Sequence, residues 1–182
     1  MAAFYGCFMV LGPITAEREM DGAHSWALIV GSQSVGLLVG SLLMLRWHAS
    51  RPILVATLMT FLFVPPIALL ALGLGAWPVA VAAFVGGIAG EVFSVYWYTA
   101  LHEHVAPEAL SRVSAYDALG SLALSPLGVV VAGPLADGIG VHATLWIGAA
   151  VGLASTVAVL FVPEVRSLRS RAAMRALPDS AL

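Results

Sequence analysis

Long apolar runs separated by short polar loops dominate the chain of 182 residues. A helix needs about 20 mainly apolar residues to cross the ~30 Å hydrocarbon core of a bilayer. The pattern predicts six such helices, at 1–16, 26–45, 52–73, 77–101, 118–136 and 143–162. The runs are continuous rather than alternating, which disfavours the short strands of a membrane barrel. We therefore expect an all-α membrane protein with a six-helix domain at 1–163 and an Arg-rich cytoplasmic tail at 164–182.

The first apolar segment is shorter than a full membrane span. Residues 1–16 give only about 24 Å of helix at a rise of ~1.5 Å per residue. Pro13 lies inside the segment and is expected to kink it. The basic region that begins a signal peptide is missing, so a truncated helix is the better interpretation. We expect the chain to be a piece of a longer protein.

Composition supports a lipid environment. The chain is 60% hydrophobic and 10% charged, whereas soluble domains contain about 25% charged residues. The single cysteine, Cys7, excludes a disulfide within the chain. The basic residues do not cluster on a soluble face, so no nucleic-acid partner is expected. Nothing in the composition indicates a cofactor.

The arginines fall mainly on one side of the predicted membrane. Only Arg18 lies in the other set of loops, beside Glu17, Glu19 and Asp21. The positive-inside rule makes the arginine-rich side cytoplasmic. We expect a multi-pass protein of the inner (plasma) membrane with both termini in the cytoplasm. The arginines on that side are Arg46, Arg51, Arg112, Arg166, Arg169, Arg171 and Arg175.

Small residues and prolines indicate how the helices pack. Three glycine pairs have the G-x-x-x-G spacing that lets helix backbones approach closely. Pro65 and Pro66 are expected to kink the helix predicted at 52–73. The glycine pairs are Gly36 with Gly40, Gly86 with Gly90 and Gly148 with Gly152.

Polar residues are distributed unevenly among the segments. The segments at 52–73 and 143–162 contain no ionisable residue inside them and are expected to face lipid. The segments at 26–45, 77–101 and 118–136 carry the polar residues and are expected to line a wetter space. The predicted cavity residues are Gln33, Ser94, Tyr98, Ser121 and Ser125.

Glu91 is an acidic residue in the middle of an apolar run. Gly87, Glu91, Ser94 and Tyr98 follow one another at steps of four, three and four positions, so they share one helix face. A carboxylate at mid-bilayer costs about 2.5–3.5 kcal/mol and marks a functional site by default. We expect Glu91 to take up and release a proton. The alternative is a neutral glutamate that is hydrogen-bonded to a neighbouring helix.

Asp117 lies at the threshold of the segment predicted at 118–136, five residues after Arg112. It either caps that helix or pairs with a basic loop. Glu108 and Arg112 follow Pro107 and predict a short interfacial helix. Together with Arg46 and Arg51, Arg112 and Asp117 are candidates for a cytoplasmic gate.

The histidines do not indicate a metal site or an enzyme. His102, Glu103 and His104 are followed by Glu108, but this spacing is loose for a metal and the site would lie at a wet interface. An intramembrane serine protease needs a Gly-flanked serine and a histidine on a facing helix. The sequence at 31–34, GSQS, lacks that pattern, and every histidine lies at a segment edge.

The stretch at 104–121, HVAPEALSRVSAYDALGS, resembles the junction of the tenth and eleventh helices in transporters of the major facilitator superfamily. The closer likeness is to drug:proton antiporters, in the branch that includes macrolide and siderophore exporters. PLG at 126–128 and AGPLAD at 132–137 continue the match. The likeness covers about residues 1–165.

This resemblance implies that the six segments correspond to helices seven to twelve, the C-terminal six-helix bundle of such a transporter. Helices seven, eight, ten and eleven then line the pathway, and nine and twelve are peripheral. The family's loop motif is present in part, since Gly40, Arg46 and Arg51 fit. Met44 stands where the motif has an aspartate.

The expected function is proton-coupled efflux of a small lipophilic or amphipathic compound by alternating access. The expected partners are the lipid bilayer, the substrate, protons, and either an N-terminal six-helix half or a second copy of the chain. One alternative is a non-transporting remnant or an accessory membrane interaction protein. Another is a six-helix unit that dimerises into a complete pore.

Overall fold

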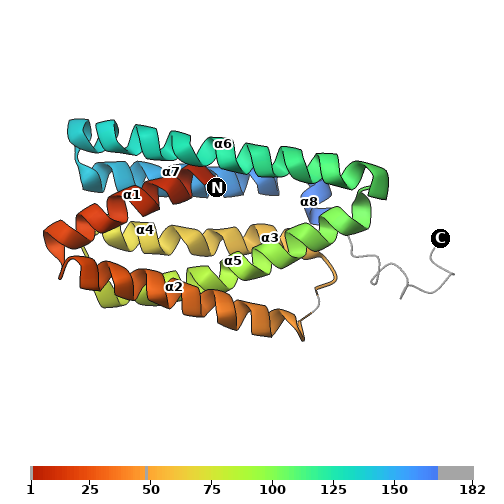
Figure 1. Cartoon of the computed structure of the whole chain (residues 1–182), viewed down its shortest axis with the longest axis horizontal. Helices are drawn as coiled ribbons and strands as arrows, with labels where there is room; N and C mark the ends of the chain where they lie inside the picture. The colour runs from red at the N-terminus through yellow and green to blue at the C-terminus, as the bar shows by residue number, and fades with distance from the viewer. Residues whose placement is uncertain (1, 48, 168–182) are drawn as a thin grey trace.

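The computed structural model describes residues 2–47 and 49–167, without the side chains at 2–4, 121–125, 127, 164 and 167. Every regular element in these ranges is helical (Figure 1). The elements are α1 (Ala2–Glu19), α2 (Ala23–Met44), α3 (Pro52–Met59), the 3₁₀ helix η1 (Thr60–Phe63), α4 (Val64–Ala71), α5 (Ala76–His104), α6 (Pro107–Ile139), α7 (Val141–Leu160) and α8 (Pro163–Ser167).

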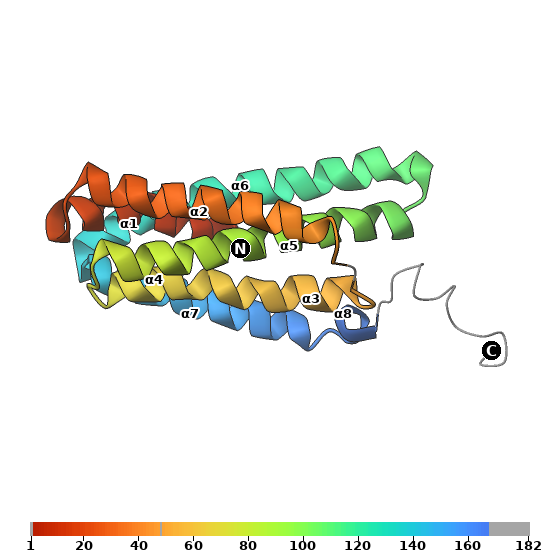
Figure 2. The ribbon, with the colours of Figure 1, turned by 90° about the horizontal axis from the view of Figure 1, so that it is seen from below.

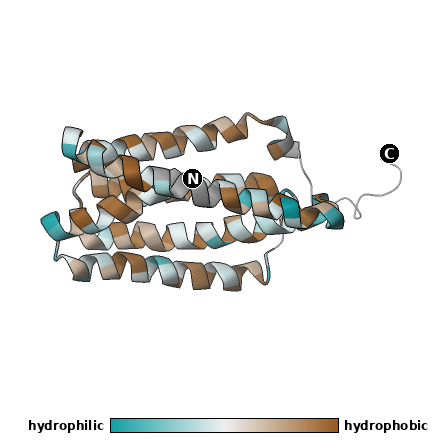
Figure 3. Ribbon diagram, turned by 45° about the horizontal axis from the view of Figure 1, so that its top comes forward, coloured by the Kyte–Doolittle hydropathy of each residue, from teal (hydrophilic) through white to brown (hydrophobic). Residues whose placement is uncertain are grey.

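Four segments of the described chain are long and apolar enough to cross a bilayer: Ala23–Met44, Pro52–Ala71, Ala76–His104 and Val141–Leu160. Among the residues whose side chains are described, α6 adds the shorter apolar stretch Gly128–Ile139. Hydrophilic residues gather toward the two ends of the bundle, and hydrophobic residues run along its length (Figure 3). The chain therefore has an all-α, multi-pass membrane fold, as the hydropathy pattern predicts.

The largest departure from the predicted bounds is in α6. The sequence predicts a short interfacial helix at Pro107 and a separate span from 118, but one helix of 33 residues joins them. Ala106 is extended, and Pro107 occupies a first-turn position where its missing N–H costs nothing. Because α6 is about 50 Å long at ~1.5 Å per residue, its first turns and the end of α5 project beyond the rest of the bundle (Figure 1).

The helices pack as three neighbouring groups (Figures 1 and 2). The most extensive contact joins α2 to α5, and α1 lies along α6. The third group contains α3, η1, α4 and α7. The main apolar core lies where α1, α4, α5 and α7 meet, and its fully buried members include Leu11, Leu70, Val79 and Leu145.

The two ends of the bundle differ in charge. At one end, which we call the arginine-rich end, Arg46 and Arg51 lie in the loop between α2 and α3, Arg112 near the start of α6 and Arg166 in α8. At the opposite, acidic end are the last turn of α1, with Glu17 and Glu19, the turn that follows it, with Asp21, and the end of α6, with Asp137. The loops that the sequence assigns to one side of the membrane thus lie at one end of the molecule.

Glycines determine how closely α2 approaches α5. A methyl group at Gly36 would overlap the Phe84 carbonyl oxygen, and one at Gly87 would overlap the Gln33 carbonyl oxygen. At Gly40 a Cβ would lie 2.8 Å from the Cβ of Glu91. The first predicted glycine pair therefore lies in a helix interface.

The Pro65–Pro66 pair interrupts a helix, as the sequence predicts. The chain passes from α3 through one 3₁₀ turn, η1, into α4, which begins with the two prolines. Pro66 has no N–H to donate to the carbonyl of Leu62 four residues earlier. That carbonyl oxygen instead faces α5, where a Cβ built on Gly86 would lie 3.3 Å away.

The segments predicted to face lipid also pack against each other. The hydroxyl oxygens of Thr60 in η1 and Thr156 in α7 are buried and lie 3.0 Å apart. Each hydroxyl group carries one proton, so one threonine donates to the other, and that other donates to a carbonyl of its own segment, either Thr60 to Thr57 or Thr156 to Gly152. These hydroxyl groups link the third segment to the last without leaving an unsatisfied polar atom.

Candidate functional site

An open groove of about 670 Å³ runs along one face of α5. Its residues recur every three or four positions, so they follow a single stripe of the helix. The predicted common face of Glu91, Ser94 and Tyr98 is therefore present in the structure. The lining residues are Glu91, Ser94, Val95, Tyr98, Thr99, His102 and Glu103.

Glu91 lies where this groove meets the interface between α2 and α5. Its Cβ stands over Gly40 of α2, and its side chain is half-buried. The carboxylate forms no hydrogen bond or ion pair with another described side chain. The alternative reading, a glutamate hydrogen-bonded to a neighbouring helix, is thus not realised among the described residues.

The groove becomes more exposed toward the arginine-rich end. Tyr98 is 55% exposed, and Thr99 and His102 are also exposed. The Nδ1 atom of His102 lies 2.7 Å from the Tyr98 carbonyl oxygen, so this nitrogen is occupied by its own helix. Near Glu91 the stripe therefore contains a single carboxyl group among apolar residues. Toward the arginine-rich end it becomes more polar, with His102 and Glu103.

The described residues contain no group of three or more His, Cys, Asp and Glu side chains that would hold a metal ion. His104 makes the same kind of contact as His102, with Nδ1 3.0 Å from the Ala100 carbonyl oxygen. Adjacent residues on a helix point about 100° apart, so His102, Glu103 and His104 do not converge.

Gln33 does not line this groove. Its side chain hydrogen-bonds the Tyr5 phenol of α1, and its backbone carbonyl faces Gly87 of α5. Gln33 thus connects α1, α2 and α5 from the interior of the contact. The other two predicted cavity residues, Ser121 and Ser125, lie on α6, outside the part of the chain whose side chains are described.

Asp117 has a different role from the two that the sequence predicts. It lies inside α6, in its third turn, and does not cap a helix. Its Oδ2 accepts a hydrogen bond of 3.2 Å from the Trp97 indole of α5. The Trp97 ring stacks on Phe93, with centroids 6.1 Å apart. Asp117 therefore links α6 to the side of α5, a partner that its sequence neighbours do not reveal.

The other predicted gate residues are exposed at the arginine-rich end. Arg46 follows the last turn of α2, Arg51 precedes α3 and Arg112 lies in the second turn of α6. The loop that holds Arg46 and Arg51 and the turn between α5 and α6 lie at the same end of the bundle (Figure 1).

A second cavity, of about 270 Å³, lies between α3, α5, α7 and α8. Apolar side chains form most of its wall. Its hydroxyl groups are already hydrogen-bonded within the protein: Thr57 donates to Ile53, Ser155 to Gly152, and Thr60 contacts Thr156. The hydroxyl protons of these residues are therefore already used within the protein, whereas no such bond is found for the groove hydroxyl groups of Ser94, Tyr98 and Thr99 among the described residues.

A curated relative can be aligned with most of the chain. The chain is 31% identical over 164 residues to the multidrug efflux pump Tap of Mycolicibacterium fortuitum, an alignment that covers 84% of this chain. The chain spans about a third, 37%, of the length of that pump. No family model and no solved structure matches the chain significantly.

The relative tests two expectations from the sequence, the transport class and the partial length of the chain. It is a pump and not an enzyme, in agreement with the non-enzymatic character expected for this chain. The match covers one part of a longer transporter, as expected for a piece of such a protein. Together with the helical membrane fold, this likeness confirms the resemblance of the chain to part of an efflux transporter of the major facilitator superfamily.

Proposed function

We propose that the chain forms the C-terminal six-helix half of a secondary active transporter. In this proposal it exports a small lipophilic or amphipathic compound in exchange for protons, by alternating access. α1, α2, the α3–η1–α4 segment, α5, α6 and α7 take the places of the six spans. The likeness to a multidrug efflux pump supports the transport class, and the α5 groove carries the assignment of the site.

The observation that carries the proposal is the position of Glu91. A carboxyl group inside a spanning helix is costly and is rarely left facing lipid. Here it heads a polar stripe that is open on one side, with no hydrogen bond to another described side chain. A group in this position exchanges a proton when its surroundings alternate between wet and dry. Glu91 is thus the proposed coupling residue, with Ser94 and Tyr98 along the substrate path.

The open groove also supports a covering partner. If lipid filled the groove, Ser94, Tyr98 and Thr99 would present their hydroxyl groups to hydrocarbon, where polar groups without partners are unfavourable. A second six-helix half placed over α2, α5 and α6 would enclose the stripe in a central cavity. We assign this position to an N-terminal half, with a second copy of the chain as the alternative that the experiment tests.

The charge difference between the two ends supports an orientation. Under the positive-inside rule, Arg46, Arg51, Arg112 and Arg166 support a cytoplasmic position for the arginine-rich end of a plasma-membrane protein. The α5–α6 hairpin, which projects from that end, then lies on the cytoplasmic side. Arg46, Arg51, Arg112 and Asp117 are the proposed residues of a cytoplasmic gate.

The test measures extrusion of a fluorescent lipophilic cation from cells that produce the chain within its full genomic reading frame. Glu91→Gln keeps the size of the side chain but cannot release a proton. We expect this variant to lose efflux that depends on the proton gradient. Glu108→Gln, which changes an exposed carboxylate in the first turn of α6, is the matched control and should keep full efflux. Unchanged efflux in Glu91→Gln would remove the coupling role.

Two further experiments test whether an N-terminal half or a second copy of the chain covers the groove. One produces the chain alone, and the other produces it together with the N-terminal half of a drug pump of the same superfamily. Efflux by the chain alone, with a dimeric species in detergent, indicates a second copy. Efflux only in the second arm supports an N-terminal half, and no efflux in any arm supports the remnant or accessory protein.

A further inference from the structure

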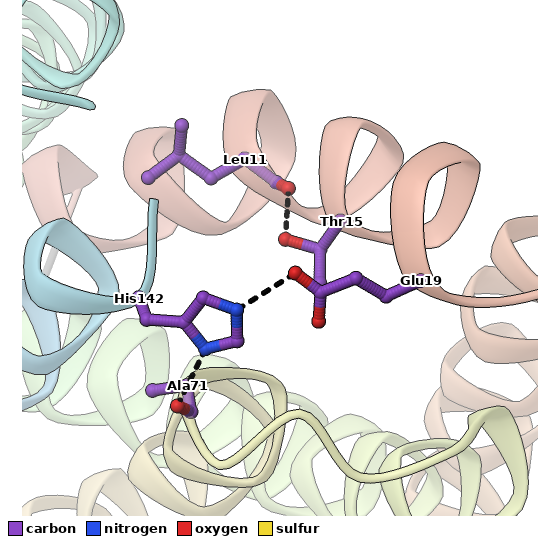
Figure 4. A network of polar contacts seen from close by, with 5 residues as sticks. All are labelled: Leu11, Thr15, Glu19, Ala71 and His142. Carbon is purple, nitrogen blue, oxygen red and sulfur yellow. Dashed lines mark hydrogen bonds and ion pairs between the residues drawn. The ribbon is translucent and has the colours of Figure 1, made fainter. Parts of the chain in front are cut away.

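Three helix ends meet at a single side chain at the acidic end of the bundle (Figure 4). His142 lies in the first turn of α7, Glu19 is the last residue of α1, and Ala71 is the last residue of α4. The imidazole lies between the other two residues. It belongs to neither the α5 groove nor the proposed transport path.

Both ring nitrogens of His142 face hydrogen-bond acceptors. Nδ1 lies 2.8 Å from the Ala71 carbonyl oxygen, and Nε2 lies 2.7 Å from Oε1 of Glu19. A carbonyl oxygen cannot donate, so Nδ1 must carry a proton. A second proton must lie between Nε2 and the carboxylate oxygen, since two lone pairs at this distance would repel. The observed geometry is therefore that of an imidazolium ion.

The Ala71 carbonyl is available because of how α4 ends. Gly73 has a φ of 66°, which favours glycine, and it turns the chain away from the helix. The Gly73 amide donates to Leu70 and the Leu74 amide to Leu69, which satisfies two of the last carbonyl groups. The Ala71 carbonyl then receives its donor from His142 of α7. A cation at this position also suits the negative end of the helix dipole.

Glu19 is unfavourably placed without the imidazolium. An acidic residue at a helix C-terminus adds negative charge where the dipole is already negative. His142 supplies the opposite charge from α7. A Cβ at Gly73 would make only ordinary contacts with the pair, at 3.5 Å from His142 and 3.6 Å from Oε2 of Glu19. The glycine therefore serves the turn through its positive φ.

Other ionisable groups at this end do not replace the contact. The Glu17 carboxylate is turned toward Gly22, and Asp21 and His24 line a neighbouring groove of about 550 Å³ that Glu19 also borders. Arg18 and Asp137 are the remaining charged residues of the α1 and α6 ends, and the turn at 72–75 has none. The groove leads from solvent to Glu19, so protons reach the pair readily.

We propose that His142 is a proton-dependent clasp that joins the ends of α1, α4 and α7. Without its second proton the imidazole keeps one N–H, which stays on the Ala71 carbonyl, and the Nε2 lone pair then faces the Glu19 carboxylate. The end of α1 is thereby released from α7. The proton stabilises the joined state, so the stabilisation is present in acid and is lost as the imidazole deprotonates with rising pH. This inference rests on the fold and is independent of the proposed transport.

Hydrogen exchange of the purified full chain tests the clasp. The reporters are the amides of Met20 and Gly22, which both bond to the Ala16 carbonyl at the end of α1. After correction for intrinsic rates, we expect these amides to exchange about two- to fivefold faster when the clasp is open, as for the loss of an exposed ion pair. The comparison spans about pH 5.5 to about pH 8.5, on either side of an ordinary imidazole pKa of about 6.5.

Two variants at the clasp should remove this pH dependence. His142→Gln retains a donor without titrating, and Glu19→Gln removes the charge of the partner. His24→Gln, a histidine at the same end that makes no such bridge, is the control and should leave the pH dependence unchanged. Equal pH dependence in His142→Gln and the native chain, or exchange that is independent of pH in the native chain, would reduce the contact to a static helix cap and overturn the proposal.

Discussion

Two stretches along α5 are built in opposite ways. Around Gly87, which lies against the Gln33 carbonyl oxygen of α2, the two helices meet through backbone contact, and Gly36 of α2 lies against α5 in the same manner. One turn further toward the arginine-rich end, the stretch from Glu91 to Glu103 lines an open groove. The first stretch joins α5 to the bundle, and the second presents functional groups along the groove.

This difference shows how a costly polar stripe is tolerated in a membrane helix. The α2–α5 interface needs no long side chains, so it fixes the position of α5 without using the polar residues. The groove residues are then free to change their surroundings while the helix stays in place. Trp97 lies beside the groove stretch, where its hydrogen bond to Asp117 connects α5 to α6.

The largest loss of stability is expected for Gly36→Ala, at the interface between α2 and α5. The added methyl group would overlap the Phe84 carbonyl oxygen, which belongs to backbone and cannot rotate away. Overpacking of this kind costs about 1–3 kcal/mol or more, against a gain in helix propensity of at most about 1 kcal/mol. Thermal unfolding in detergent should show a clear loss of stability.

Gly31→Ala is the matched control for that variant. Gly31 is exposed on the same helix, and a Cβ there would have no neighbour within 4 Å. This variant should be neutral or more stable, by up to about 1 kcal/mol. Equal losses in Gly36→Ala and Gly31→Ala would mean that the α2–α5 interface does not hold α5 in place.

An intermediate loss of stability is expected when the hydrogen bond between Trp97 and Asp117 is removed. Trp97→Phe keeps an aromatic ring beside Phe93 but removes the donor to Asp117. The loss of a hydrogen bond to a carboxylate costs about 1.5–3 kcal/mol when the group is buried, and the half-buried Asp117 should fall at the lower end. Denaturant unfolding measures the change, with Trp146→Phe, at an exposed tryptophan of α7, as control. If the two variants lose equal stability, the Trp97–Asp117 bond does not join α5 to α6.

The smallest effect on stability is expected in the groove. Glu91→Gln should change the free energy of unfolding by no more than about 0.5 kcal/mol, as for a position without specific partners. The same thermal unfolding assay checks this value. A loss as large as that of Gly36→Ala would show that Glu91 supports the packing of α5 on α2, and the contrast between the two stretches would then fail.

Much of the fold was predictable because lipid imposes simple rules. Continuous apolar runs predict helices, and the Pro65–Pro66 pair predicts a kink, close to which the structure has the 3₁₀ turn η1. The start of α6 was not predictable in the same way. Pro107, Glu108 and Arg112 are typical of a short polar helix, and hydropathy alone cannot show that the chain continues without a turn into the apolar part of α6.

The site was predictable only where it lies on one helix. The three- and four-residue steps of Glu91, Ser94 and Tyr98 specify a shared face before any packing is known. By contrast, the bond from Trp97 to Asp117 joins two helices, and the clasp joins three. The acceptor in the clasp is a backbone carbonyl of Ala71, which every residue possesses, so no side-chain pattern could have revealed it.

The 3₁₀ turn at Thr60–Phe63 has a mechanical consequence. A helix whose hydrogen-bond ladder is interrupted bends at that point more easily than a continuous rod. The chain between Pro52 and Ala71 therefore behaves as two short rods with a flexible joint. The first rod and the joint are tied to α7 through Thr60, and the second is tied to it through Ala71 and His142. Because the joint absorbs a tilt of either rod, the acidic end can loosen while the arginine-rich end keeps its alignment.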